Sequence, residues 1–250
     1  MRRKIGVVNV FDKPYRVWSR RKTTTEEALE LVRKEGLSLI EALEVNHELM
    51  EEVSTHTQAA SRMLRVLADN GLEGHVDRAL DSSSEYHYLC EQMPREVPAA
   101  LDAYQGMFPE YDQFEVNEAI NTYGVKIAEN QVLFHGGQWP TTGSTFVTSR
   151  PFSTSFCPQV ALRNAEWRGK AYDAGRVDLM VVRVTSLATK GYVYSREGSR
   201  GNEKEIVFAS GGQLKHVRET HIADIKVRKI ASGIREVEKI VPAYMVEVEM

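Results

Sequence analysis

The chain has 250 residues, of which 42% are hydrophobic and 27% charged, and its 32 Lys and Arg nearly balance 35 Asp and Glu. The resulting net charge of −3 excludes a uniformly basic nucleic-acid coat and a strongly acidic tail. No apolar run reaches the roughly 18 residues of a transmembrane helix, so we expect a globular protein with no membrane partner. The two cysteines, Cys90 and Cys157, agree with a cytoplasmic location, and delivery into a target cell stays open.

Charge is unevenly distributed at the start of the chain. Residues 2–22 hold eight basic residues and one acid, whereas residues 26–52 hold nine glutamates. We expect a basic strand or arm that lies against an acidic helical face. The alternative is a basic arm that steers the protein to nucleic acid.

The first 82 residues carry helix signals. Thr24–Glu27 and Ser38–Glu41 have the spacing of capping boxes. Apolar residues and His47 then recur three and four apart over residues 40–50, which predicts a helix with one buried face. We therefore predict a helical N-terminal region over residues 1–82, acting as a cap or as a partner-binding domain.

Strand signals replace helix signals after about residue 128. Helical patterns persist over residues 84–128 and are interrupted by three prolines. Strands are then predicted over residues 131–135, 145–149, 177–185, 206–208 and 243–249. Helices followed by strands indicate an α+β fold, with residues 83–250 as the second domain.

Common cofactor and metal motifs are absent from the sequence. It has no phosphate-binding loop of the Gly-x-x-x-x-Gly-Lys-Ser/Thr type and no Gly-x-Gly-x-x-Gly after a strand. The segment His47–Glu51 lacks the second histidine of a zinc-protease helix, so no metal site is predicted.

Three short segments carry groups suited to sugar chemistry: Phe134–Gly137, Phe152–Phe156 and Asn202–Phe208. Residues i and i+2 of a strand share a face, so Glu203 and Glu205 are predicted to point the same way. One carboxylate can stabilise an oxocarbenium-like sugar, and its neighbour can orient or deprotonate a nucleophile. Serine hydroxyls of the middle segment can hold a carboxylate or the sugar.

The order and spacing of these segments resemble ADP-ribosyltransferases of the R-S-E class, which include arginine-specific toxins and the phage Alt and Mod transferases. The resemblance covers roughly residues 99–250 and rests on Ser153-Thr154-Ser155 followed by Glu203-x-Glu205. It implies a helical N-terminal part followed by a mixed or antiparallel β-sandwich core. It also implies NAD⁺ as co-substrate.

The resemblance also implies residue roles. Glu205 matches the catalytic glutamate, Glu203 the residue that engages the acceptor, and Ser153 the serine that positions Glu205. A Glu at position 203 is similar to arginine-modifying members. The residues expected to bind NAD⁺ are His135, Gly136, Thr154, Ser155, Arg150 and Arg163, with Arg168 as an alternative diphosphate contact. The segment Tyr192–Asn202 matches the target-recognition loop.

The chain departs from the class at one position. The R-S-E class has Arg at the end of the first strand, where this chain has His135. Phe134-His135-Gly136 looks like the Tyr-His-Gly of the diphtheria-toxin and poly-ADP-ribose polymerase class, in which His bonds the NAD⁺ ribose and Gly holds the nicotinamide amide. His135 cannot replace a bidentate arginine. Either Arg150 covers the diphosphate or NAD⁺ binds less tightly.

The predicted function is therefore a mono-ADP-ribosyltransferase that cleaves NAD⁺ at the nicotinamide–ribose bond. Its expected partner is a host or target protein, modified on arginine. Three alternatives stay open: an NAD⁺ glycohydrolase, a nucleic-acid ADP-ribosyltransferase that uses residues 2–22, and a non-catalytic NAD⁺-binding module.

Overall fold

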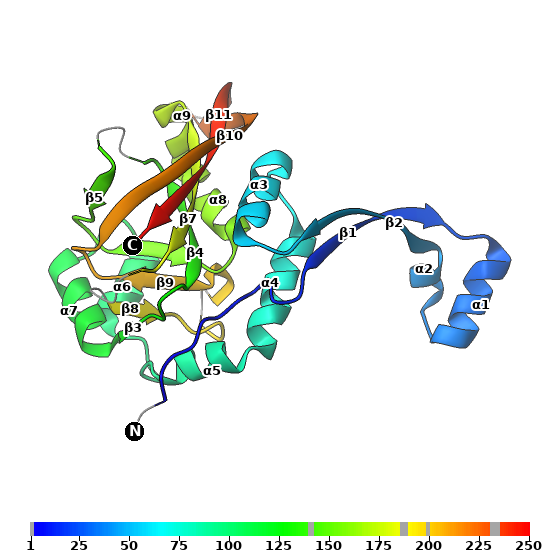
Figure 1. Ribbon diagram of the computed structural model, residues 1–250, viewed down its shortest axis with the longest axis horizontal. Helices are drawn as coiled ribbons and strands as arrows, with labels where there is room; N and C mark the ends of the chain where they lie inside the picture. The colour runs from blue at the N-terminus through cyan, green and yellow to red at the C-terminus, as the bar shows by residue number, and fades with distance from the viewer. Residues whose placement is uncertain (1–2, 140–142, 186–189, 199–200, 231–235) are drawn as a thin grey trace. The chain divides into compact units, whose positions relative to one another are not determined.

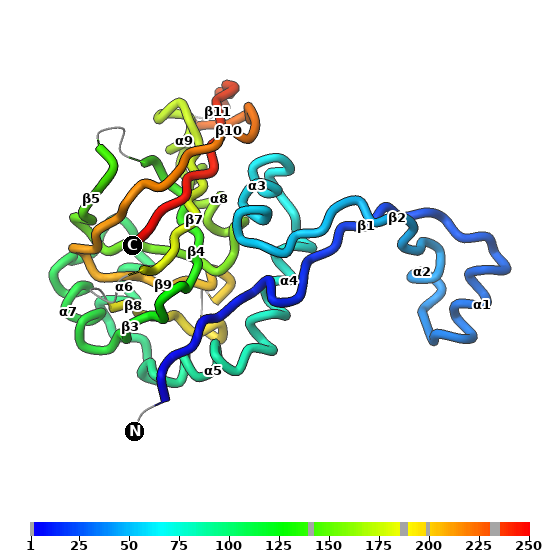
Figure 2. The backbone as a smooth tube through the Cα atoms, viewed as in Figure 1, coloured from blue at the N-terminus to red at the C-terminus, as the bar shows by residue number. Residues whose placement is uncertain are grey.

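The computed structural model describes residues 3–139, 143–185, 190–198, 201–230 and 236–250. The chain divides into two compact units. The core unit comprises Met1–Val10 and His56–Met250, and the insert unit comprises Phe11–Thr55. Figure 2 follows the backbone through both units.

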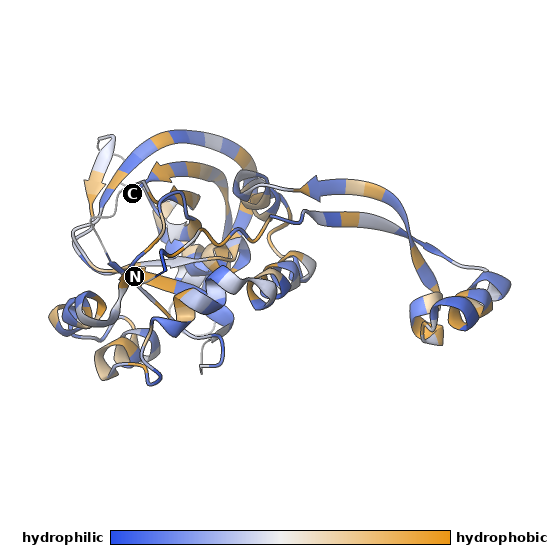
Figure 3. Cartoon of the chain, turned by 60° about the horizontal axis from the view of Figure 1, so that its bottom comes forward, coloured by the Kyte–Doolittle hydropathy of each residue, from blue (hydrophilic) through white to orange (hydrophobic). Residues whose placement is uncertain are grey.

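The insert unit is a two-stranded antiparallel ribbon with two helices between its strands (Figure 1). Its elements are β1 (Tyr15–Lys22), α1 (Thr25–Glu35), α2 (Leu39–Ala42) and β2 (Glu44–Val53). Hydrophobic residues are interspersed with hydrophilic ones along both strands (Figure 3). The pairing runs from Tyr15 opposite Val53 to Lys22 opposite Glu44.

The helix predicted across residues 40–50 is wrong, although its start is correct. Ser38 and Glu41 form the predicted capping box, but α2 ends at Ala42 and β2 begins at Glu44. Ile40, expected on a buried face, is 83% exposed. Pairing with β1 overrides the local helical spacing here. The basic strand β1 therefore pairs with the acidic strand β2, and Arg21 also contacts Glu27 of helix α1.

Helices dominate the first half of the core unit. They are α3 (His56–Val66), α4 (Asn70–Ser82), α5 (Ser84–Glu91), α6 (Ala99–Met107) and α7 (Gln113–Tyr123). Asp69 and Asp112 cap α4 and α7 by accepting hydrogen bonds from first-turn amides. The domain boundary expected between residues 82 and 83 falls between α4 and α5, inside the core unit.

Within the described residues, nine strands form one mixed sheet in the order β3-β8-β9-β6-β4-β7-β11-β10-β5. They are β3 (Val125–Lys126), β4 (Val132–Gly137), β5 (Thr145–Val147), β6 (Phe152–Ser155), β7 (Val177–Arg183), β8 (Lys190–Val193), β9 (Glu205–Phe208), β10 (Gln213–Ile230) and β11 (Glu236–Glu249). β7 and β11 are parallel, and the other neighbours are antiparallel. The α+β class is confirmed.

A single residue pair joins the two halves of the sheet. Phe134 of β4 lies opposite Ser155 of β6, whereas β4 pairs with β7 along its whole length. The strands β4 and β6 are therefore not paired beyond this point, on the side of His135 and Gly136.

Helix α8 (Pro158–Glu166) packs closely against β4. A Cβ atom on Gly136 would lie 1.7 Å from the carbonyl oxygen of Ala161, and 2.8 Å from the nitrogen of Ala165. Only glycine fits at this position. A 3₁₀ turn (Trp167–Gly169) and α9 (Lys170–Ala174) follow α8.

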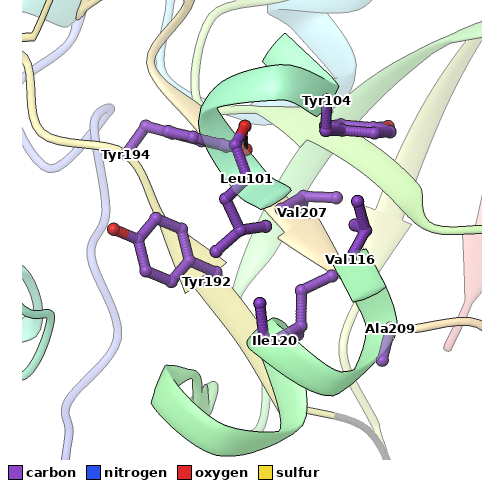
Figure 4. Close-up of a cluster of buried hydrophobic side chains, with 9 residues drawn as sticks. Leu101, Tyr104, Val116, Ile120, Tyr192, Tyr194, Val207 and Ala209 are labelled. Atoms are coloured by element: carbon purple, nitrogen blue, oxygen red, sulfur yellow. Dashed lines mark hydrogen bonds between the residues drawn. The ribbon is translucent and has the colours of Figure 1, made fainter. Parts of the chain in front are cut away.

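Helices α6 and α7 cover β8 and β9 through a buried cluster (Figure 4). Its labelled members are Leu101, Tyr104, Val116, Ile120, Tyr192, Tyr194, Val207 and Ala209. Tyr192 and Tyr194 are thus core residues, and the start of the predicted target-recognition loop at Tyr192 is wrong. Ser199 and Arg200 of that loop lie outside the described residues.

Among the residues that the structure describes, no helix is both long enough and apolar enough to span a bilayer.

Candidate active site

A cavity of about 990 Å³ opens where β4 and β6 separate. Residues of β4, β6, α6, α8 and α9 line it, together with the segment that precedes β9. The lining includes most of the residues expected from the sequence: His135, Gly136, Arg150, Ser153, Thr154, Ser155, Glu203 and Glu205. Residues far apart in the sequence therefore share one cavity.

The carboxylate of Glu205 is held on both oxygens. Ser153 Oγ donates to Oε1 at 2.5 Å, and Gln105 Nε2 donates to Oε2 at 3.3 Å. Glu205 is only 6% exposed. Hydrogen bonds of this kind fix the direction of a carboxylate and lower the cost of burying it.

Gln105 was not found from the sequence, because it belongs to no motif. It follows Leu101 by four residues in α6, so it lies near the helix face that packs on the core. The only sequence signal for Gln105 is its place in a predicted helix, next to the apolar face that is expected to be buried.

The three hydroxyls of Ser153-Thr154-Ser155 each bond to a different residue of the segment 203–206. Beyond the Ser153–Glu205 contact, Thr154 Oγ1 donates to the carbonyl of Ile206 at 2.8 Å. Ser155 Oγ donates to the carbonyl of Glu203 at 2.7 Å. The register of β6 against β9 is therefore held by side chains as well as by the backbone ladder.

The expectation that Glu203 and Glu205 share the face of one strand is wrong. Glu203 ends a 3₁₀ turn (Gly201–Glu203), and β9 begins only at Glu205. Lys204 between them has φ +50°, which breaks the strand geometry. Both glutamates still line the cavity.

His135 lies in the cavity as a neutral group. Its Nδ1 is 2.6 Å from the carbonyl oxygen of Ser153. A carbonyl can only accept, so Nδ1 carries the proton and Nε2 is left as an acceptor. Burial lowers the pKa of His135 to about 4, and the nearby Lys170 and Arg150 act in the same direction.

Four cationic side chains also line the cavity: Arg150, Arg168, Lys170 and Arg176. Arg176 is neutralised by Asp178 and Glu219, each 2.6 Å away. The Lys170 ammonium group lies 5.1 Å from the centre of the Trp167 ring. Its pKa is lowered mainly by burial and further by the positive charge of Arg150. The cavity that contains Glu205 is thus also lined by cationic side chains.

Arg163 does not line the cavity. Its guanidinium is 3.1 Å from Glu73 of α4, and the side chain is 54% exposed. The expectation that it contacts the diphosphate is therefore corrected: α8 turns Arg163 away from the cavity and towards α4.

Within the described ranges, no group of three or more His, Cys, Asp or Glu could hold a metal ion. Burial raises the pKa of both the Cys90 and the Cys157 thiol. Neither thiol has the character of an activated nucleophile.

No protein-family model matches the sequence, and no curated protein matches it. Among solved structures, the enzymatic component C2-I of the C2 toxin from Clostridium botulinum is similar at 11% identity and a TM-score of 0.37, over 66% of this chain and 45% of that chain. This chain spans less than half the length of that component. Vis toxin, an ADP-ribosyltransferase from Vibrio splendidus, has 13% identity and a TM-score of 0.32, over 92% and 87% of the two chains. Exoenzyme S from Pseudomonas aeruginosa has 14% identity and a TM-score of 0.30, over 89% and 82%.

Proposed function

We propose that this protein is a mono-ADP-ribosyltransferase that uses NAD⁺ and modifies an arginine of a target protein. The observation that carries the proposal is the carboxylate of Glu205, held by Ser153 and Gln105 in a cavity that also contains cationic side chains. Glycosyl transfer needs an anion beside the developing positive sugar and separate cations for a phosphate-bearing substrate.

The reaction begins at the bond between nicotinamide and C1′ of the ribose. Nicotinamide leaves with the bonding electron pair, and the ribose becomes oxocarbenium-like. Glu205 stabilises this positive charge electrostatically, because its carboxylate is already oriented and largely removed from water. No reorganisation of the carboxylate is needed during the step.

The acceptor step follows from Glu203. A guanidinium nitrogen attacks C1′, a new C–N bond forms, and the proton that the nitrogen loses passes to the Glu203 carboxylate. A carboxylate is suited both to bind a guanidinium and to take its proton. This is why arginine is the acceptor that we propose.

Other groups of the cavity bind the substrate. Nε2 of His135 accepts a hydrogen bond from a ribose hydroxyl, since Nδ1 is committed to the carbonyl of Ser153. Arg150 and Lys170 balance the charge of the diphosphate. The nucleic-acid alternative has less support, because the basic strand β1 is engaged internally: Arg16 contacts Glu52 at 2.8 Å and Arg21 contacts Glu27 at 2.5 Å.

The test is incubation of the purified protein with bacterial lysate and NAD⁺ labelled in its ADP-ribose part. Wild type is expected to label protein on arginine. Glu205→Gln is expected to release no nicotinamide, whereas Glu203→Gln is expected to release nicotinamide without labelling protein. Glu238→Gln, an exposed site on β11, is the matched control. Absence of nicotinamide release by wild type would contradict the proposal. Label found only in free ADP-ribose would show that water is the acceptor, and label found only in nucleic acid would show that nucleic acid is the acceptor.

A further inference from the structure

The residue between the two glutamates is a buried lysine. The side chain of Lys204 is only 2% exposed. Its Nζ lies 3.2 Å from Glu73 and 3.3 Å from Asp77, which both belong to α4. Lysine is almost never fully buried unless it is paired, so these two carboxylates are what keep it inside the protein.

The backbone at Lys204 is bent into the left-handed region, which residues with a side chain rarely adopt. Contacts on both sides hold this bend. Ser155 Oγ donates to the carbonyl of Glu203, and the amide of Phe156 donates to the carbonyl of Lys204 at 3.1 Å. The Lys204 ammonium donates to the carbonyl of Asn202 at 2.9 Å. The bend therefore depends on the lysine side chain as well as on β6.

The same face of α4 holds a second cation. Arg196 contacts Asp77 at 2.8 Å and also pairs with Asp81. Glu73, Asp77 and Asp81 are spaced four apart, so they lie on one side of the helix. Burial alone would raise the pKa of Glu73, but Lys204 and Arg163 hold it below its usual range, so this carboxylate stays charged.

We propose that Lys204 is a positioning residue, clamped by Glu73 and Asp77, which fixes Glu203 for transfer to a guanidinium acceptor. This inference rests on the proposed function. Lys204 is the chain neighbour of Glu203, and its ammonium group is fixed to the carbonyl of Asn202 and to α4, so loss of the clamp displaces Glu203. Ser153 and Gln105 keep Glu205 in place. The clamp therefore sets how much ADP-ribose reaches the acceptor and how much is lost to water.

The first measurement compares two rates in wild type and Lys204→Met: transfer to agmatine, and nicotinamide release without acceptor. Transfer is expected to fall about 100-fold, as for a misplaced catalytic group. Release is expected to fall by no more than about threefold, because Glu205 keeps its contacts. Lys226→Met, which breaks an exposed pair with Glu238, is the matched control and leaves both rates unchanged. Equal losses of transfer and release would overturn the inference.

A second variant separates positioning from folding. In Lys204→Met alone, Glu73 and Asp77 lose a buried cation, which destabilises the protein. The triple variant Lys204→Met, Glu73→Gln and Asp77→Asn also neutralises the two carboxylates that had faced the lysine. Arg196 keeps Asp81, and Arg163 is more than half exposed, so neither arginine is left as a buried unpaired charge. The melting temperature of the triple variant is expected to lie closer to that of wild type, and transfer is still expected to fail. Recovery of transfer in the triple variant would overturn a positioning role.

A readout that does not depend on activity completes the test. Hydrogen exchange of the amides of residues 201–206 is expected to become faster in both Lys204 variants and to stay unchanged in Lys226→Met. Unchanged exchange would overturn the clamp. Absence of NAD⁺ cleavage by wild type would instead contradict the proposed function, and the exchange result would still decide the clamp.

Discussion

Ser153 and Glu205, 52 residues apart in sequence, are joined by a hydrogen bond of 2.5 Å from Oγ to Oε1. The contact links β6 to β9 across the register that pairs Ser155 with Glu205. It turns the Glu205 carboxylate towards the cavity, where Gln105 holds the second oxygen. The orientation of this carboxylate is the basis of the proposed chemistry.

Removing this contact should slow the reaction without unfolding the protein. Ser153→Ala is expected to lower kcat for nicotinamide release by about 10- to 100-fold, the value of a hydrogen bond to a charged group. Gln105→Met should cause a smaller loss, since its bond is longer. Steady-state kinetics measure both, with Ser82→Ala on the exposed side of α4 as control. A change in KM with unaltered kcat would contradict the positioning of Glu205.

The cations of the cavity should govern binding of NAD⁺. Arg150→Met and Lys170→Met are each expected to raise the KM for NAD⁺ about tenfold, because each removes a charge-assisted contact to phosphate. Added salt should raise the KM of wild type more than that of the double variant. Arg228→Met, an exposed substitution on β10, serves as the control. If the KM for NAD⁺ is the same in wild type and in both variants, then neither Arg150 nor Lys170 contacts NAD⁺.

Stability should fall in mild acid. His135 and His56 have ordinary pKa values of 6.5, and burial lowers both to about 4 in the folded protein. Between these values the unfolded chain binds protons that the folded protein does not. The contribution of these two histidines to the free energy of unfolding is therefore complete above pH 6.5. It decreases as the pH falls towards 4.

The quantity to measure is the slope of the free energy of unfolding against pH. Each histidine contributes up to about 1.4 kcal/mol per pH unit over that window. Urea unfolding at about pH 7 and about pH 5 gives the slope, and His56→Gln should make it shallower by one histidine's share. Identical slopes for wild type and variant would show that His56 does not titrate as stated.

Gly136→Ala should destabilise the protein by at least about 2 kcal/mol, because the new methyl group would overlap the backbone of α8. The urea midpoint is the readout. Gly74→Ala, in the interior of α4, is the matched control: its nearest neighbour is a flexible arginine at 3.4 Å, so stability should stay the same or rise. A neutral Gly136→Ala would show that α8 can move away from β4.

Periodicity and turn residues determined much of the core unit from sequence. The prolines of residues 84–128 separate α5, α6 and α7, and the alternating residues at the end of the chain form β11. These patterns are local, so they are readable without the fold. The Ser-Thr-Ser and Glu-x-Glu segments were also recognisable, because their residue types are set by chemistry and not by packing.

Tertiary structure alone decided the geometry of the site and of the insert unit. The strand β2 replaced a predicted helix because pairing with β1 outweighs local spacing. Lys204 has a left-handed backbone, and carboxylates of α4, more than 120 residues away, hold its ammonium group. Arg163 pairs with Glu73 for the same reason: a partner distant in sequence decides where its charge goes. Local patterns specify elements and candidate groups, whereas the pairing of buried charges depends on which elements the fold brings together.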